Sequence, residues 1–125
     1  MAEDVALAYR LVEAIGVRDY DAIGRLLAPG ARLRALVPHA LREDECSEAV
    51  VARLRSWWDE IRDFELLESE VEEMADRLRV RYRIRASGGE DGPSLVEQTA
   101  YLTVEGDRIA VVNLVCSGFR PAPTA

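Results

Sequence analysis

Lysine is absent from this chain. All sixteen basic residues are arginine, so no side chain can form the Schiff base on which lysine-dependent enzymes rely. Histidine occurs once, at His39. The spacing of this histidine, the two cysteines and the carboxylates resembles no metal site. We therefore expect neither a metal ion nor another cofactor.

Cysteine and long apolar runs are also scarce. Cys46 and Cys116 lie far apart and form no CxxC motif, and the longest apolar stretch, residues 109–116, is much too short to span a bilayer. The acidic N-terminus, Met1 to Asp4, lacks the basic and apolar segments of a signal peptide. These features favour a reduced, cytoplasmic protein.

Acidic residues outnumber basic ones and give a formal net charge of −7. Such a surface repels phosphate backbones and anionic lipid, so neither nucleic acid nor a membrane is expected as a partner. The chain has 125 residues, of which 49% are hydrophobic and 31% charged, as in one globular domain. We place that domain at residues 1–120 and expect a flexible tail over 121–125, because Pro121 and Pro123 interrupt it.

Apolar residues at helical spacing dominate the first half of the chain. They predict an amphipathic helix over residues 3–16 and a second helix between Asp19 and Pro29. A short strand over residues 31–37 and a loop over residues 38–45 are expected to follow.

A third helix is predicted by the longest helical repeat of apolar residues, which comprises Val50, Leu54, Trp57, Trp58 and Ile61. Asp44 or Ser47 is expected to cap its start.

The second half alternates in the manner of strands. Residues 64–73 and 77–86 predict a hairpin with its arginine row in solvent and a Val80–Tyr82–Ile84 row in the core. One register matches every pair: it sets Glu72, Glu70 and Glu68 opposite Arg79, Arg81 and Arg83, and sets Val71 and Leu67 opposite Val80 and Ile84. Strands over 95–104 and 109–117 complete an α+β protein, and the glycine-rich segment 87–94 reads as a plain connection.

This order of elements is similar to that of the nuclear-transport-factor-2-like superfamily. Residues 18–23 and 26–31 resemble its helix-to-strand segment, residues 105–109 resemble its last turn, and residues 118–121 resemble the ending of small uncharacterised bacterial members of its SnoaL-like (polyketide-cyclase-like) branch. The resemblance implies a cystatin-like cone, in which three N-terminal helices pack on a curved, mixed but mostly antiparallel sheet. It leaves the function open, because this fold hosts isomerases, dehydratases, cyclases and non-catalytic modules.

The resemblance also allows the catalytic residues of known members to be compared with the residues of this chain. A ketosteroid-isomerase-like site needs a tyrosine on the first helix and an aspartate on each of two strands, and this chain has Leu11, Ala35 and Ala100 there. That activity is therefore not expected. His39 is the only ready candidate for a cyclase-type acid or base, and its alternative is an exposed loop histidine.

Four residues are candidates for a ligand pocket inside the cone. Trp57 would form a wall, Tyr82 and Gln98 would be polar anchors, and Cys116 would face inward. Each has a plainer alternative, namely core packing for Trp57 and Tyr82, burial with protein partners for Gln98 and an inert small side chain for Cys116.

The last strand is apolar on both faces, which indicates that something covers its second face. Related proteins pair through the outside of this sheet, so we expect a homodimer whose interface includes Val111, Asn113 and Val115.

Three functions remain open. The first is a small apolar molecule bound in the cone, the second is a non-catalytic dimeric module with a filled cone, and the third is an isomerase or cyclase that uses His39.

Overall fold

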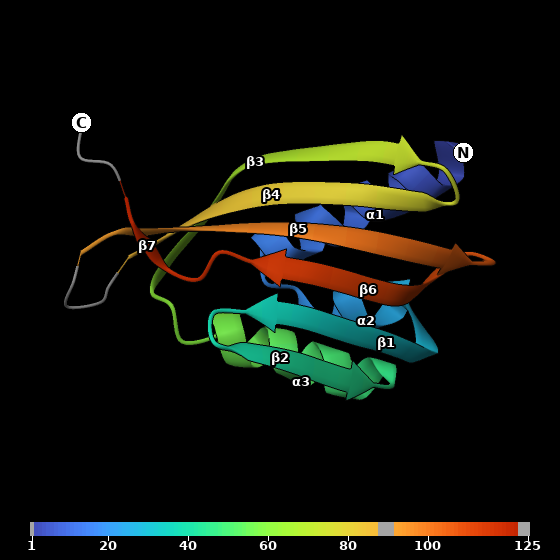
Figure 1. Cartoon of the computed structure of the whole chain (residues 1–125), viewed down its shortest axis with the longest axis horizontal. Coiled ribbons are helices and arrows are strands. Elements are labelled where there is room, and N and C mark those ends of the chain that lie inside the picture. Colours follow the sequence, from blue (N-terminus) through green and yellow to red (C-terminus); the bar gives the residue numbers. More distant parts are fainter. Residues whose placement is uncertain (1, 88–91, 123–125) are drawn as a thin grey trace.

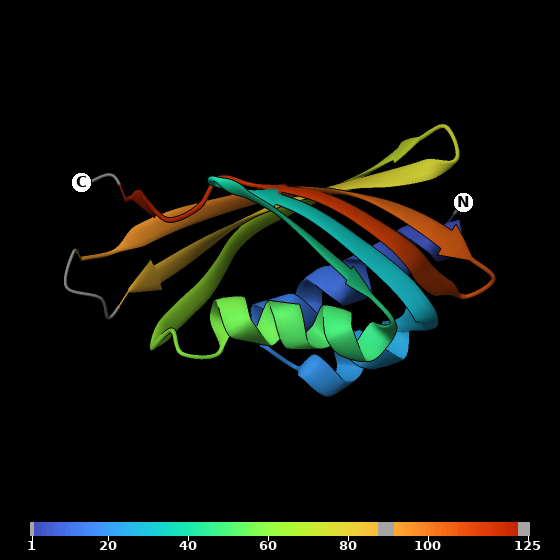
Figure 2. The same ribbon diagram turned by 60° about the horizontal axis from the view of Figure 1, so that its bottom comes forward.

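The computed structural model describes residues 2–87 and 92–122, which form a layer of helices against a sheet (Figure 1). Its elements are α1 (Ala2–Gly16), α2 (Tyr20–Leu26), β1 (Leu27–Val37), β2 (Ala40–Glu45), α3 (Ser47–Trp58), β3 (Asp63–Met74), β4 (Arg77–Ser87), β5 (Ser94–Glu105), β6 (Arg108–Cys116) and β7 (Arg120–Pro121). All three helices lie on one side of the curved sheet (Figure 2). The predicted α+β class and the predicted curved, mixed sheet are therefore confirmed.

The strand order is β2-β1-β6-β5-β4-β3, with the short β7 added to β5. Among the strand pairs of the described residues, only β1 and β6 are parallel; they are joined through β2, α3 and the β3–β5 meander. The sheet thus brings the first strand of the chain beside the last long one. Among the helices of the described ranges, none is long and apolar enough to cross a membrane.

The β3–β4 hairpin has the predicted charged register. Glu72, Glu70 and Glu68 face Arg79, Arg81 and Arg83 in sequence, and Val71 faces Val80. The carboxylates of Glu72 and Glu70 accept hydrogen bonds of 3.0 Å from the arginines opposite them. Val80, Tyr82 and Ile84 are buried while Arg81, Arg83 and Arg85 are exposed, as expected from the alternation.

One predicted pair of this hairpin is wrong. Ile84 faces Leu66, and a β-bulge leaves Leu67 without an opposite residue. The bulge shifts the alternation by one position, so that Phe64 and Leu66 on one side of it and Val71 on the other all pack against the core. A regular strand would have turned Phe64 to the outer face.

The segment predicted as a loop over residues 38–45 is also different. Pro38 and His39 form a tight turn, in which His39 has a φ of 67°, and residues 40–45 form the edge strand β2. Its sequence, ALREDE, is mostly polar and exposed, so it lacks the apolar alternation by which strands are recognised. The turn is held from the other side by Gly118, whose φ of 75° and close approach to Pro38 leave no room for a side chain.

The ends of α3 are not capped as predicted. The N-cap residue is Cys46, without a side-chain hydrogen bond, and Asp44 instead accepts a hydrogen bond of 2.9 Å from Arg53 Nε. At the other end Arg18, in the turn between α1 and α2, donates to the carbonyls of Trp58 and Ile61 at 2.9 and 2.6 Å. This guanidinium satisfies the carbonyl that α3 leaves open at Trp58 and ties the α1–α2 corner to the C-terminal end of that helix.

The C-terminal segment is partly tied down. Pro121 belongs to β7, and the Ala122 amide donates to the Pro93 carbonyl at 3.0 Å. The rest of the predicted tail, residues 123–125, lies outside the described residues, as do residues 88–91 of the predicted glycine-rich connection.

Candidate functional site

Three of the four predicted pocket residues lie on one rung of the sheet. Tyr82 on β4 faces Gln98 on β5, and Gln98 faces Cys116 on β6. The Tyr82 hydroxyl donates a hydrogen bond of 2.5 Å to Gln98 Oε1. This polar rung, Tyr82–Gln98–Cys116, crosses the middle of an otherwise apolar inner face.

The Tyr82 phenol of the polar rung is held in its neutral form. Burial raises the pKa of the Tyr82 phenol well above its ordinary value, and the neighbouring Cys116 adds to that rise. Tyr82 therefore acts as a hydrogen-bond donor and not as a phenolate. Gln98 is completely buried, and its Nε2 has no hydrogen-bond partner among the described residues. Cys116 Sγ accepts the Gly118 amide at 3.4 Å.

The interior of the cone is almost filled by its own side chains. The cavity beside Tyr82 has a volume of about 20 Å³, which is room for a single water molecule. Its walls come from the three helices and from β1, β4, β5 and β6, and they are apolar except for the Tyr82 hydroxyl; they include Leu11, Ile15, Ile23, Leu33, Leu54, Ala100 and Leu114. Leu11 and Ala100, which the resemblance aligns with the phenol and with one of the acids of a ketosteroid-isomerase-like site, are part of this packing.

Trp57 and His39 stand apart from the polar rung. Trp57 is half-buried with its ring 6.3 Å from that of Trp58, and it is Trp58 that packs edge-on against Phe64 and Phe119. His39 is exposed in the β1–β2 turn and makes no hydrogen bond or ion pair within the described ranges. The residues described include no group of histidines, cysteines and carboxylates that could hold a metal ion.

The predicted interface residues Val111, Asn113 and Val115 alternate along β6 with the core residues Val112 and Leu114 and therefore lie on its outer face. Opposite them on β5 are Thr103, Tyr101 and Thr99. Together these six residues form an uncharged strip, which we call the outer strip. Charged pairs border it on both sides, with Glu/Arg ladders on β3–β4 and with Arg34 and Glu43 on β1–β2.

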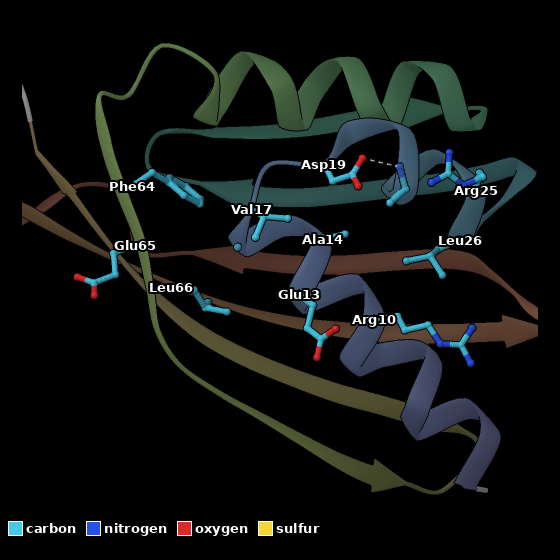
Figure 3. A pocket seen from close by; sticks show the side chains of 12 residues that line it. Arg10, Glu13, Ala14, Val17, Asp19, Arg25, Leu26, Phe64, Glu65 and Leu66 are labelled. Carbon is cyan, nitrogen blue, oxygen red and sulfur yellow. Dashed lines mark hydrogen bonds between the residues drawn. The ribbon is translucent and has the colours of Figure 1, made fainter.

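A much larger hollow lies on the other side of the molecule, between α1, α2 and β3 (Figure 3). We call it the helix groove. Its volume is about 790 Å³, within the usual range for ligand sites. It is lined by Arg10, Glu13, Ala14, Gly16, Val17, Asp19, Ala22, Arg25, Leu26, Phe64, Glu65 and Leu66.

The groove follows from how α1 meets β3 and α2. A Cβ placed on Gly16 would lie 3.0 Å from Leu66 Cδ2, so glycine lets the end of α1 approach β3 this closely without displacing the Leu66 side chain. Asp19 caps α2 by accepting from the Ala22 amide at 3.1 Å, which turns the chain back along α1. The side of α1 that faces away from the sheet and the inner side of α2 thereby enclose a common surface.

The groove has no clear signature in the amino-acid sequence. Arg10, Glu13, Ala14 and Val17 do recur at helical spacing, but a stripe with two charges in four positions reads as a solvated surface. The third wall comes from β3, where the bulge at Leu67 lets Phe64 and Leu66 turn towards the helices. That wall was not readable from the alternation alone.

No family model and no curated protein matches the chain. Solved structures do. A proposed polyketide cyclase from Xanthomonas campestris pv. campestris superposes with a TM-score of 0.76 at 18% identity, over 91% of this chain and 90% of that one. An NTF2-like protein of unknown function from Burkholderia pseudomallei gives 0.72 at 19% identity, over 91% and 90% of the two chains.

A third similar structure is a hypothetical protein with a ketosteroid-isomerase-like fold from Catenulispora acidiphila, in complex with trimethylamine. It superposes with a TM-score of 0.73 at 13% identity, over 90% of this chain and 85% of that one. At such identities the likeness shows the fold and no shared activity. With its cone, its strand order and these neighbours, the chain has the nuclear-transport-factor-2-like fold.

Proposed function

We propose that this chain is a SnoaL-like binding protein that takes a small, largely apolar molecule in the helix groove and not inside the cone. The observation that carries the proposal is the contrast in volume: about 20 Å³ inside the cone against about 790 Å³ in the groove. A drug-sized ligand needs several hundred cubic ångströms. The apolar lining of the groove, from Ala14, Ala22, Leu26, Phe64 and Leu66, suits such a ligand.

Binding is favoured over catalysis by the state of the polar rung. General acid–base chemistry needs a group that can lose and regain a proton near neutral pH. Tyr82 has its pKa shifted away from neutrality by burial, and Gln98 does not titrate. The polar rung therefore reads as a packing and specificity device of the cone, and we assign it no reaction.

The proposal is tested with a neutral apolar dye, N-phenyl-1-naphthylamine, whose fluorescence rises on entering an apolar site. Val17→Asp and Leu26→Asn, both at the groove, should weaken dye binding several-fold because they add polar groups to its wall. Tyr82→Phe, which changes only the cone, should leave the affinity unchanged. Dye binding that responds to Tyr82→Phe and ignores the two groove variants would place the ligand in the cone after all.

A second candidate function is that of a dimeric interaction module. The filled cone and the outer strip support it. The outer strip continues into an exposed apolar row in which Val115 neighbours Leu36 on β1 and Leu36 neighbours Leu41 on β2. These three side chains are 52%, 53% and 48% exposed, which is unusual for adjacent large apolar residues. We propose that a second copy of the chain covers this face, in either function.

The dye experiment distinguishes the two proposed functions. A parent protein that dimerises but shows no saturable dye binding would favour the interaction module. Saturable binding at one site per chain, lost in the groove variants, would favour the binding protein.

A further inference from the structure

The chemistry of the helix groove is uneven from end to end, and this unevenness indicates what kind of molecule fits it. We infer that the groove selects amphipathic monocarboxylates, with the acid group at the end that carries Arg10 and Arg25. The inference rests on the proposed binding function and adds the ligand class. It concerns only residues that line the groove.

Arg10 and Arg25 stand at one end of the groove. Figure 3 shows them on either side of Leu26, Arg10 projecting from α1 and Arg25 from α2. The two helices run in opposite directions, so the middle of α1 lies beside the end of α2. Two cationic side chains from different elements thus flank Leu26 at this end of the groove.

Neither guanidinium is paired with a carboxylate of residues 2–87 or 92–122. Other arginines of this chain, such as Arg53, Arg79 and Arg83, form ion pairs of 2.9 to 3.0 Å with carboxylates. Within the described ranges Arg10 and Arg25 form no ion pair and no side-chain hydrogen bond. An arginine fork matches a carboxylate in shape as well as in charge, so a free acid is a fitting partner.

The opposite end of the groove is apolar. Phe64, Leu66 and Val17 lie there (Figure 3). The side chain of Val17 is largely exposed to water although it is apolar. A hydrocarbon chain laid from Leu26 towards Phe64 would remove these side chains from water. The groove therefore offers a cationic end and an apolar end, as an amphipathic ligand requires.

Three carboxylates also line the groove and limit the charge of the ligand. Asp19 is engaged with the Ala22 amide, and Glu65 points away from the groove (Figure 3). Glu13 remains, one turn of α1 beyond Arg10 and nearer to the apolar end. Its charge disfavours a dianion and disfavours placing the acid group in the middle, so a single carboxylate at the arginine end is the best match.

The test compares three probes with the same ten-carbon chain, namely decanoate, 1-decanol and decyltrimethylammonium, by calorimetric titration of the full chain at low salt. Decanoate should bind about tenfold more tightly than 1-decanol, and the cationic probe should bind least. Arg10→Gln and Arg25→Gln should each weaken decanoate binding about threefold to fivefold and leave 1-decanol binding unchanged. Glu13→Gln should tighten decanoate binding, and added salt should reduce the preference for the acid.

Arg42→Gln is the matched control, because Arg42 is an exposed arginine on β2, away from the groove. It should change none of the three affinities. Equal binding of decanoate and 1-decanol, both weakened by Val17→Asp, would leave the groove as a binding site and overturn the assignment of monocarboxylates. Tightest binding of the cationic probe would overturn it as well. Absence of saturable binding by all three probes would reject the binding function itself, and the inference with it.

Discussion

Tyr82 and Gln98 are the residues at which packing and polarity meet in this protein. Each has a hydrogen-bonding group enclosed among side chains such as Val80, Ile84 and Ala100, and the Tyr82 hydroxyl donates one short hydrogen bond to Gln98 Oε1. A buried polar group without a partner costs more than a hydrogen bond contributes when it is made. The pair should therefore behave as a unit.

A double-mutant cycle tests this coupling. Tyr82→Phe leaves the Gln98 amide with one partner fewer, and Gln98→Met leaves the Tyr82 hydroxyl unpaired, so each should lower the free energy of unfolding by about 1–3 kcal/mol. The double variant should be more stable than the sum of the two losses implies, because no polar group is then left unpaired. Urea denaturation measures all four proteins; additive losses would show that the two side chains act independently.

Alkaline pH offers a second test at Tyr82. Its pKa is raised in the folded chain, so above pH 10 the unfolded chain gives up a proton that the folded chain keeps. The stabilisation is complete below the ordinary tyrosine pKa of 10.0 and is lost as the pH rises beyond it, by up to about 1.4 kcal/mol per pH unit.

Tyr82→Phe should remove this contribution. The stability gap between the parent protein and Tyr82→Phe, measured in urea, should therefore be smaller at about pH 11 than at about pH 8. A gap that stays constant over that interval would contradict the burial of a neutral phenol. Tyr20, whose pKa burial also raises, is present in both proteins and cancels from the comparison.

Among the single elements, the register of β3 with β4 could be predicted from the sequence, whereas the bulge in β3 and the edge strand β2 could not. The β3–β4 pairing was predictable because like charges and apolar residues alternate strictly on β4, which fixes the face of every residue. The bulge at Leu67 was not, since two adjacent leucines, Leu66 and Leu67, carry the same signal and only packing against α1 separates them. The edge strand β2 escaped notice because it has no buried face to leave a pattern.

The two leucines should differ sharply when truncated. Leu66 packs at Gly16 and lines the groove, so Leu66→Ala should cost about 1–3 kcal/mol of unfolding free energy. Leu67 is 46% exposed at the bulge, and Leu67→Ala should stay within about 0.5 kcal/mol of the parent protein. Thermal or urea unfolding measures both; equal losses would mean that the bulge lies elsewhere on β3.

At the scale of the whole molecule, the sequence predicted the fold of the cone but not the volume of the cavity inside it. The inner faces of β4 and β5 could be assigned from the sequence, but β6 is apolar on both faces and its sequence left the inner face open. In the structure Tyr82, Gln98 and Cys116 meet on one rung. The volume left between them depends on how the helices fit against that face, and no local pattern encodes it. For the same reason the predicted pocket was placed inside the cone, whereas the large hollow lies between α1, α2 and β3.

The outer strip supplies a test at this scale. If a second copy covers it, Val115→Glu should convert a dimer into a monomer, because the new carboxylates would face each other or an apolar row. Tyr9→Glu, an equally charged change at an exposed aromatic residue on α1, should leave the dimer intact. Sedimentation velocity distinguishes the two; a monomeric parent protein would reject the proposed pairing outright.

The two borders of the sheet bear on how many copies can assemble. One border is β2, with the run Arg42, Glu43, Asp44 and Glu45, and the other is β3, with Glu68, Glu70 and Glu72. Strands so crowded with carboxylates repel a neighbour that would extend the hydrogen-bond ladder sideways. Only the broad face is left to attract another chain, and a face that binds its own copy is used up after one encounter. If a second copy covers the outer strip as proposed, we expect association to end at two copies and not to continue into filaments.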